Sequence, residues 1–187
     1  MKQNILNHYF EKVYCINLER RPDRLALAKA EFKKHNIKVE FVKGVDGLKL
    51  DFPATPSKHE GMVSKGDLGC TLSHLKVVQL AKKNKLNNYF VFEDDAELIE
   101  NFNELFSICM DNMPDDWEQI YLGGNFDVQP VKVNDYIYKM VRTFTTHAFA
   151  VKNNIYDEMI EVLSQREKVD VAVASLHSRF NCYVTSP

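Results

Sequence analysis

Residues 89–98 read YFVFEDDAEL, an apolar run that ends directly in three consecutive carboxylates. The run Tyr89–Phe92 is rich in aromatic residues and contains a β-branched valine, which favours a buried β-strand. Glu93, Asp94 and Asp95 follow at its carboxyl end. Because ligands of α/β proteins bind at the carboxyl ends of the strands, this stretch predicts both a central strand and a polar site beside it.

The rest of the chain alternates strand-like and helical segments around this strand, which indicates an α/β fold. Segment 48–65 is the exception, because it contains Pro53 and Pro56, shows no periodicity and is expected to be a long loop. The pattern predicts a mixed sheet flanked by helices in a single domain over residues 1–187. Strands are expected at 13–18, 39–43, 119–122, 136–141 and 143–151, and helices at about 22–35, 67–83, 98–110 and 154–164.

Composition argues against several classes of protein. The 187 residues carry a net charge of -2, which gives no basic footprint for binding nucleic acid. No apolar run approaches the ~18 residues of a membrane-spanning helix, and the N-terminus lacks a secretory signal pattern. A cytoplasmic protein without a transmembrane segment is therefore expected, while peripheral contact with a membrane stays open. The four cysteines form no C-x-x-C pair, which favours reduced, buried thiols over a zinc or redox motif.

The three consecutive acids have two explanations. On an extended backbone, residues two apart share a side, so Glu93 and Asp95 are expected to point together while Asp94 points away. Two convergent carboxylates suit Mg²⁺ or Mn²⁺. Alternatively, Asp94 or Asp95 caps a following helix, whose positive end favours acidic residues. The acidic residues by themselves leave both explanations open.

Five stretches, taken together, resemble glycosyltransferase family 25, which includes bacterial lipooligosaccharide galactosyltransferases and the collagen galactosyltransferases. The resemblance extends over about residues 13–175. It implies a GT-A-like, Rossmann-like fold, a UDP-sugar donor that is often UDP-galactose, and an inverting transfer to a sugar or other hydroxyl acceptor. In the family's order, the stretches are VYCINLERRPDR (13–24), GVDG (44–47), GDLGCTLSHLKVVQLA (66–81), VFEDDAEL (91–98) and YLGGN (121–125).

The resemblance also implies roles at the acidic motif. Glu93 and Asp95 match the family's metal-binding acids, with Mn²⁺ or Mg²⁺ bridging the donor diphosphate. Asp94 is expected to contact the ribose. His147, on a later strand, is expected to complete the metal shell or touch the acceptor, although ordinary strand packing explains it nearly as well.

The nucleotide is expected beside the first strand. Arginines bind a diphosphate, and amide, hydroxyl and carboxylate groups hydrogen-bond a base or ribose. Ordinary explanations stay open, namely an ion pair within its own helix for Arg24, a turn for Asp46 and helix packing for His74. The candidate nucleotide-binding residues are Asn17, Arg20, Arg21, Arg24, Asp46, Ser73, His74 and Asp94.

An inverting transfer needs a base that takes the proton of the acceptor hydroxyl. Asp127, just beyond YLGGN, is one candidate. Asp170 resembles an acidic position that family members carry before a late helix, and it is the preferred candidate. A role as the N-cap of a helix that begins near Val171 explains Asp170 equally well.

Two other interpretations remain. Family members commonly continue beyond the region matching NCYVTSP (181–187), so the chain is either a short member or truncated at its C-terminus. The alternative function is therefore a non-catalytic module that binds nucleotide-sugar or glycan. A phosphotransfer receiver domain or small phosphatase also holds Mg²⁺ at strand ends, but YLGGN (121–125) lacks the phosphoacceptor aspartate that a receiver needs, which disfavours this interpretation.

Overall fold

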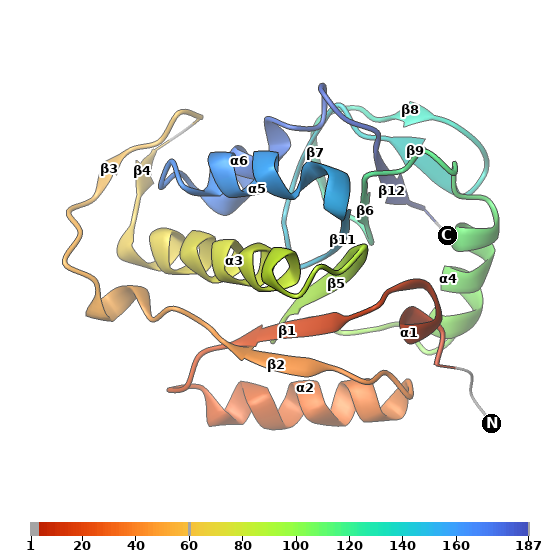
Figure 1. The fold of residues 1–187 in the computed structure, drawn as a ribbon, viewed down its shortest axis with the longest axis horizontal. Coiled ribbons are helices and arrows are strands. Elements are labelled where there is room, and N and C mark those ends of the chain that lie inside the picture. Colours follow the sequence, from red (N-terminus) through yellow and green to blue (C-terminus); the bar gives the residue numbers. More distant parts are fainter. Residues whose placement is uncertain (1–3, 60, 187) are drawn as a thin grey trace.

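A mixed eight-stranded sheet with helices on both faces forms the body of the protein (Figure 1). The structure is a computed structural model and describes residues 4–59 and 61–186. It confirms the α/β class and the mixed sheet predicted from the sequence. In sheet order, the strands are β2 (Glu40–Lys43), β1 (Val13–Asn17), β5 (Asn88–Glu93), β11 (Ala148–Lys152), β6 (Gln119–Tyr121), β12 (Cys182–Thr185), β9 (Ile137–Lys139) and β8 (Val131–Lys132).

The sheet has two parts with different strand directions. In the parallel half, β1 pairs in parallel with both β2 and β5. In the mixed half, β11 runs antiparallel to β5 and β6, while β12 is parallel to β6 and antiparallel to β9, which also pairs with β8. The carboxyl ends of β1, β2 and β5 therefore share one edge of the sheet with the amino end of β11, and the site is built at this edge.

Helices cover both faces of the sheet, and the central strand is buried between them. Tyr89 and Val91 of β5 pack into the core under α3, α5 and α6, while Phe90 and Phe92 pack into the core on the side of α1, α2 and α4 (Figure 1). A strand buried on both faces reads as a continuous apolar run. The helices are α1 (Leu6–Tyr9), α2 (Pro22–Lys34), α3 (Lys65–Lys83), α4 (Phe102–Asp111), α5 (Tyr156–Leu163) and α6 (Val169–Ala174).

None of the helices within residues 4–59 and 61–186 is both long enough and apolar enough to cross a bilayer. The longest, α3, begins with a reciprocal cap in which the Ser64 hydroxyl accepts from the backbone of Asp67 and the Asp67 carboxylate accepts from the backbone of Ser64. The sequence predicted that this helix begins at Asp67. Asp67 is instead the third residue of the helix, which begins two residues earlier at Lys65.

Segment 48–65 has more regular structure than the sequence predicted. It contains part of the short 3₁₀ helix η1 (Gly47–Lys49) and a hairpin of β3 (Thr55–Pro56) and β4 (Met62–Val63). The backbone N–H of Lys58 donates to the buried carboxylate of Glu167, which ties this hairpin to the start of α6.

The later part of the chain differs most from the sequence prediction. The expected strand at 143–151 is two strands, β10 (Arg142–Phe144) and β11, because Thr145 has a positive φ of 70° that breaks the extended backbone. β10 pairs with β7 (Asn125–Val128) in a separate ribbon. Neither β7 nor β12 was predicted, and α4 begins at Phe102 rather than near residue 98. The 3₁₀ helix η2 (Asn153–Ile155) completes the described elements.

Candidate functional site

The edge at the carboxyl ends of β1, β2 and β5 contains two adjoining cavities. We name the first the arginine cavity; it encloses about 190 Å³, and its lining includes three arginines. We name the second the acidic cavity; it encloses about 420 Å³ and lies toward β11 and α6. Cys70 and Glu93 line both cavities, so the two spaces meet at the end of β5. Site residues of the arginine cavity are Arg20, Arg21, Arg24, Ser73, His74 and Asp94, and those of the acidic cavity are Asp67, Asp95, Thr146, His147 and Asp170.

Asp94 is the most firmly held of the three consecutive acids. The Asn17 side-chain amide donates to Asp94 Oδ2 at 2.6 Å, and Arg24 Nη1 donates to Asp94 Oδ1 at 3.1 Å. The same Arg24 nitrogen lies 2.9 Å from Asp95 Oδ2. The ion pair of Arg24 therefore joins α2 to the acidic motif instead of linking two residues of its own helix. One guanidinium pairs with two neighbouring carboxylates and offsets part of their charge, which reduces the repulsion between them.

The helix-cap explanation of the acids is wrong, because α4 begins at Phe102 and its N-cap residue is Asn101. The expectation that Asp94 points away from Asp95 is also corrected. Residues after Glu93 leave the strand and enter a turn, so the alternation of an extended backbone does not continue through the motif. Glu93 and Asp95 nevertheless line the same acidic cavity, as two convergent ligands would.

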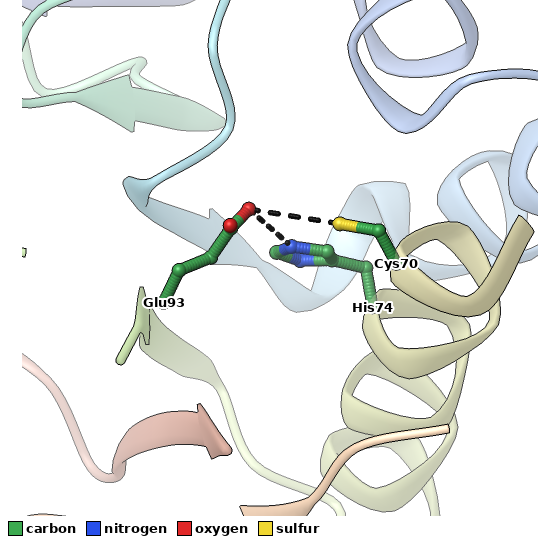
Figure 2. Close-up of side chains that lie close together, drawn as sticks. All are labelled: Cys70, His74 and Glu93. Atoms are coloured by element: carbon green, nitrogen blue, oxygen red, sulfur yellow. Dashed lines mark hydrogen bonds and ion pairs between the residues drawn. The ribbon is translucent and has the colours of Figure 1, made fainter. Parts of the chain in front are cut away.

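Glu93 faces α3 and contacts two side chains there (Figure 2). Its Oε1 atom lies 3.3 Å from His74 Nε2 and 3.7 Å from Cys70 Sγ. Burial acts to raise the pKa of Glu93, whereas the hydrogen bonds from His74 and Cys70 and the charge of the two histidines, His74 and His147, act to lower it, and the net direction is below the ordinary carboxyl value. Glu93 is thus held as a carboxylate at the junction of the two cavities.

The GVDG motif fits closely against α3. A Cβ atom on Gly47 would lie 1.8 Å from the carbonyl oxygen of Lys65, and one on Gly69 would lie 2.7 Å from the Gly47 nitrogen. Ser73 completes the contact, since its hydroxyl accepts from Val45 N at 2.8 Å and donates to Gly69 O at 2.6 Å. Glycine is required at these positions for close backbone approach, and Ser73 is committed to holding the loop in place.

The remaining nucleotide candidates of this edge carry ion pairs. Asp46 Oδ2 lies 3.2 Å from Arg20 Nε, and Asp46 Oδ1 accepts from the backbone of Leu48 at 3.2 Å. Arg21 pairs with Asp23 at 2.7 Å at the start of α2. Arg20 and Arg21 both line the arginine cavity. Their ion pairs are half-exposed or exposed, so an anionic ligand could compete for them at small cost.

Asp170 lies in the acidic cavity and does not cap a helix. It sits in the first turn of α6, whose N-cap residue is Lys168, and its Oδ2 accepts from the backbone N–H of Thr145 at 3.3 Å. The left-handed φ of Thr145 is rare for a β-branched residue. This strained turn points a backbone donor at Asp170 and places His147 in the same cavity.

Asp127 is separated from these residues. It lies on β7, pairs with Arg142 Nε at 3.1 Å and is absent from the lining of both cavities. Geometry therefore favours Asp170 over Asp127 as the candidate base.

The expected metal ligands Glu93, Asp95 and His147 share the acidic cavity. Within the part of the chain that the structure describes, however, the compact group of potential ligands is Cys70, His74 and Glu93, whose ligand atoms lie within 4.8 Å of one another. Cys70 was not among the residues predicted for the site. Its signal was the C-x-x-x-H spacing in a helix, which places a thiol and an imidazole one turn apart.

Comparison with known proteins identifies the family. The chain matches the model of glycosyltransferase family 25, described as an LPS biosynthesis protein family, over residues 10–178. The chain belongs to glycosyltransferase family 25. This match covers all five motifs that carried the resemblance in sequence.

Family 25 relatives include bacterial and human proteins. A Haemophilus influenzae protein named as a glycosyltransferase is 31% identical over 92% of this chain and 64% of its own length. Human procollagen galactosyltransferase 2 is 30% identical over 61% of this chain and 21% of its own length. The human inactive glycosyltransferase 25 family member 3 is 30% identical over 66% of this chain and 23% of its own length. The chain thus spans between about a fifth and two thirds of these curated relatives.

A solved structure confirms the fold. The crystal structure of a glycosyltransferase involved in glycosylation of the major capsid of PBCV-1 aligns with a TM-score of 0.55. The alignment covers 94% of this chain and 81% of that chain at 10% sequence identity. The GT-A-like fold expected for this member of family 25 is therefore confirmed, and at this identity the likeness concerns the fold alone.

Proposed function

We propose that this chain is a metal-dependent inverting glycosyltransferase that moves a sugar, galactose in the first instance, from a UDP-sugar to a hydroxyl of a glycan acceptor. The observation that carries the proposal is the pair of adjoining cavities that meet at Glu93. One is lined by arginines suited to a diphosphate, and the other by the acids and histidine suited to the reacting groups.

The residues of the arginine cavity would bind the nucleotide. Arg20 pairs with Asp46 in the loop after β2, and Arg21 pairs with Asp23 at the start of α2. Both guanidinium groups are partly exposed and can exchange these carboxylates for phosphate oxygens. Asp94 is held by Asn17 and Arg24 and keeps the end of β1 against the end of β5. Its role is to fix the cavity wall, and contact with the ribose stays a prediction.

The chemistry of the donor atoms fits a divalent cation in the acidic cavity. Carboxylates of Glu93 and Asp95 and the imidazole of His147 are ligand types that Mn²⁺ accepts, with Mg²⁺ favouring the oxygens. When bound, the cation would stabilise the negative charge that develops on the departing diphosphate. Within the chain itself, Glu93 and Asp95 would hold the cation near the junction of the cavities, and the arginines would supply the direct contacts to the diphosphate.

Asp170 would act as the base. Its carboxylate lies in the acidic cavity, and the Thr145 N–H fixes the orientation of Oδ2. A sugar bound with its anomeric carbon between Glu93 and Asp170 would present one face to the acceptor hydroxyl and the opposite face to the diphosphate. As the hydroxyl oxygen bonds to the anomeric carbon, its proton would pass to Asp170 and the bond from that carbon to the diphosphate oxygen would break on the opposite face, which inverts the configuration.

Transfer assays on purified protein test this function. UDP-galactose, UDP-glucose and UDP-N-acetylglucosamine are each supplied with Mn²⁺, Mg²⁺ or chelator, and UDP release is measured with and without glycan acceptors. We expect UDP-galactose with Mn²⁺ to give the highest rate and the linkage formed to have the inverted anomeric configuration. Equal turnover in chelator, or retention of configuration, would refute metal dependence or the inverting mechanism respectively.

Substitutions of Glu93 and Asp95 test whether transfer takes place at the acidic cavity. Glu93→Ala and Asp95→Ala are expected to abolish transfer while thermal unfolding remains cooperative. Glu100→Gln is the matched control, because Glu100 is an exposed acid of the same segment that lines neither cavity. Full transfer by either alanine variant would remove the assignment of these residues.

A non-catalytic module that binds nucleotide-sugar or glycan is the alternative, and a specific observation supports it, namely that a human relative is named as inactive. Thermal stabilisation by a UDP-sugar with Mn²⁺, without UDP release for any acceptor, would favour this alternative. The cytoplasmic location expected from the sequence stays a prediction.

A further inference from the structure

Helix α3 presents a thiol and an imidazole to Glu93 at the junction of the two cavities. Cys70 and His74 are four residues apart, so their side chains project from the same face of the helix. Figure 2 shows both directed at the Glu93 carboxylate, which comes from the end of β5. Among the cysteines of residues 4–59 and 61–186, Cys70 is partly exposed whereas Cys15, Cys109 and Cys182 are buried.

The two distances from Glu93 to its partners on α3 are close to those of a tetrahedral metal site. With zinc–sulfur bonds of about 2.3 Å and bonds to nitrogen and oxygen of about 2.0–2.1 Å, tetrahedral ligands lie about 3.3–3.6 Å from one another. Glu93 Oε1 lies 3.3 Å from His74 Nε2 and 3.7 Å from Cys70 Sγ. All three ligand atoms lie within 4.8 Å of one another, so small movements of the side chains would bring them to one cation.

We propose that Cys70, His74 and Glu93 bind a thiophilic divalent cation of the Zn²⁺ class, with its fourth position open to the cavities. Sulfur, imidazole and carboxylate ligands together suit Zn²⁺ better than Mg²⁺ or Mn²⁺, which prefer oxygen. The thiol proton is released to solvent when the sulfur binds. This ligand set differs from the Glu93, Asp95 and His147 set of the proposed function.

The surrounding charge also favours a cation. Cys70 lines the acidic cavity together with Asp67 and Asp170. The carboxylates of Glu93, Asp67 and Asp170 around the thiol give this space a negative potential, which attracts a divalent cation.

The site gives a route to inhibition, and this step rests on the proposed function. Glu93 lines both cavities and is counted there among the ligands of the donor metal. An ion held by Cys70 and His74 also binds Glu93, so that Glu93 is no longer available as a ligand of the donor metal. Divalent zinc binds nitrogen and sulfur ligands more tightly than Mn²⁺, so low concentrations of zinc inhibit transfer in the presence of Mn²⁺.

Cobalt spectroscopy tests the site without reference to activity. Co²⁺ added to the full chain is expected to give a thiolate charge-transfer band together with tetrahedral visible bands, saturating at about one ion per chain. Cys70→Ser should abolish the charge-transfer band, and His74→Gln should weaken Co²⁺ binding at least tenfold. Cys109→Ser is the matched control, since Cys109 is a buried cysteine of α4 outside the site. A band that is absent from the native protein, or that persists in Cys70→Ser, overturns the proposal.

A second measurement needs no variant. Alkylation of each cysteine is followed by mass spectrometry, and Zn²⁺ is expected to protect Cys70 at least tenfold while excess Mg²⁺ does not. Equal alkylation with and without saturating Zn²⁺ overturns the site even if Cys70→Ser fails to fold.

The inhibitory role has its own test. Zn²⁺ is titrated into the transfer reaction with Mn²⁺ fixed, and inhibition is compared with each variant's own uninhibited rate. We expect Cys70→Ser to raise the inhibitory zinc concentration at least tenfold. Unchanged sensitivity would overturn the inhibitory role alone. Absence of all transfer, with the cobalt band present, would reject the proposed function and keep the metal site.

Discussion

The parallel and mixed halves of the sheet hold their polar side chains in different ways. In the parallel half, Asn17 and Asp94 are buried and joined by a hydrogen bond, and the buried Ser73 hydroxyl makes hydrogen bonds to two backbone groups. In the mixed half, taken together with the separate β7–β10 ribbon, Asp127 pairs with Arg142 in a partly exposed ion pair, and Asp170 accepts from one backbone donor at 3.3 Å. The half proposed to bind the nucleotide is thus preformed, whereas the half proposed to receive the acceptor is held by fewer and more exposed contacts.

The largest expected effect concerns the reaction in the mixed half. Asp170→Asn removes the proposed base and should lower kcat by about 10²–10⁴-fold, with the thermal midpoint nearly unchanged. Steady-state transfer assays measure the change. Asp127→Asn, at the candidate outside the cavities, should retain activity. A larger loss in Asp127→Asn than in Asp170→Asn would reverse the assignment of the base.

The next effect concerns the packing of the parallel half. Gly47→Ala forces a Cβ atom onto the backbone of Lys65 and should lower the free energy of unfolding by about 3 kcal/mol or more. Gly66→Ala is the control, because the nearest atom to its Cβ is Ser64 Oγ at 3.5 Å and alanine favours the helix by up to about 1 kcal/mol. Chemical denaturation measures both. Similar free energies of unfolding for the two variants would show that the loop around Gly47 can shift at little cost, and that the parallel half is not tightly packed there.

Acid should weaken the mixed half through His177. Burial lowers the pKa of this imidazole to about 4, and its Nδ1 accepts from the backbone N–H of Thr143. Between pH 6.5 and 4 the unfolded chain binds a proton that the folded protein does not, so stability falls as pH falls. The loss at pH 5 relative to pH 8 should be about 2 kcal/mol. Denaturation of His177→Gln, measured over the same range, should show a flatter profile, and an unchanged slope would exclude His177 as the cause.

The smallest effects compare one arginine from each half. Arg142→Gln breaks an ion pair whose side chains are 42% and 34% exposed and should cost no more than about 1 kcal/mol. Arg24→Gln leaves the buried Asp94 without its cation and should cost about 1–2 kcal/mol, since Arg24 itself is partly exposed. Thermal unfolding of the matched pair gives the difference. Equal costs would remove the contrast between the two halves.

The sequence predicts the parallel half well because its signals are local. The apolar run of β5 and the periodicity of α3 appear in consecutive residues, and the acids follow β5 directly. The partners of those acids could not be predicted in the same way. Arg24 lies seventy residues before Asp94, and only the register of β1 beside β5 brings α2 to the acidic motif.

The mixed half was predicted less well because its strands are short and depend on tertiary pairing. β6, β9 and β10 have three residues each, too few for a periodic pattern. The turn at Thr145 has no glycine to mark its positive φ. Cys70 was not predicted as a site residue for a different reason. Its place in the site depends on the contact with Glu93, which follows from tertiary packing and is not visible in the helix sequence.

The position of β12 has a consequence for how the protein is made. This strand, formed by residues 182–185, lies between β6 and β9, and Cys182 pairs with Gln119. During synthesis, β1, β2 and β5 can associate before the later strands have been made. The edges of β6 and β9 that pair with β12 stay unpaired until residues 182–185 have been synthesised. The mixed half should therefore be the last part to fold and the part most exposed to misassembly before synthesis reaches Thr185.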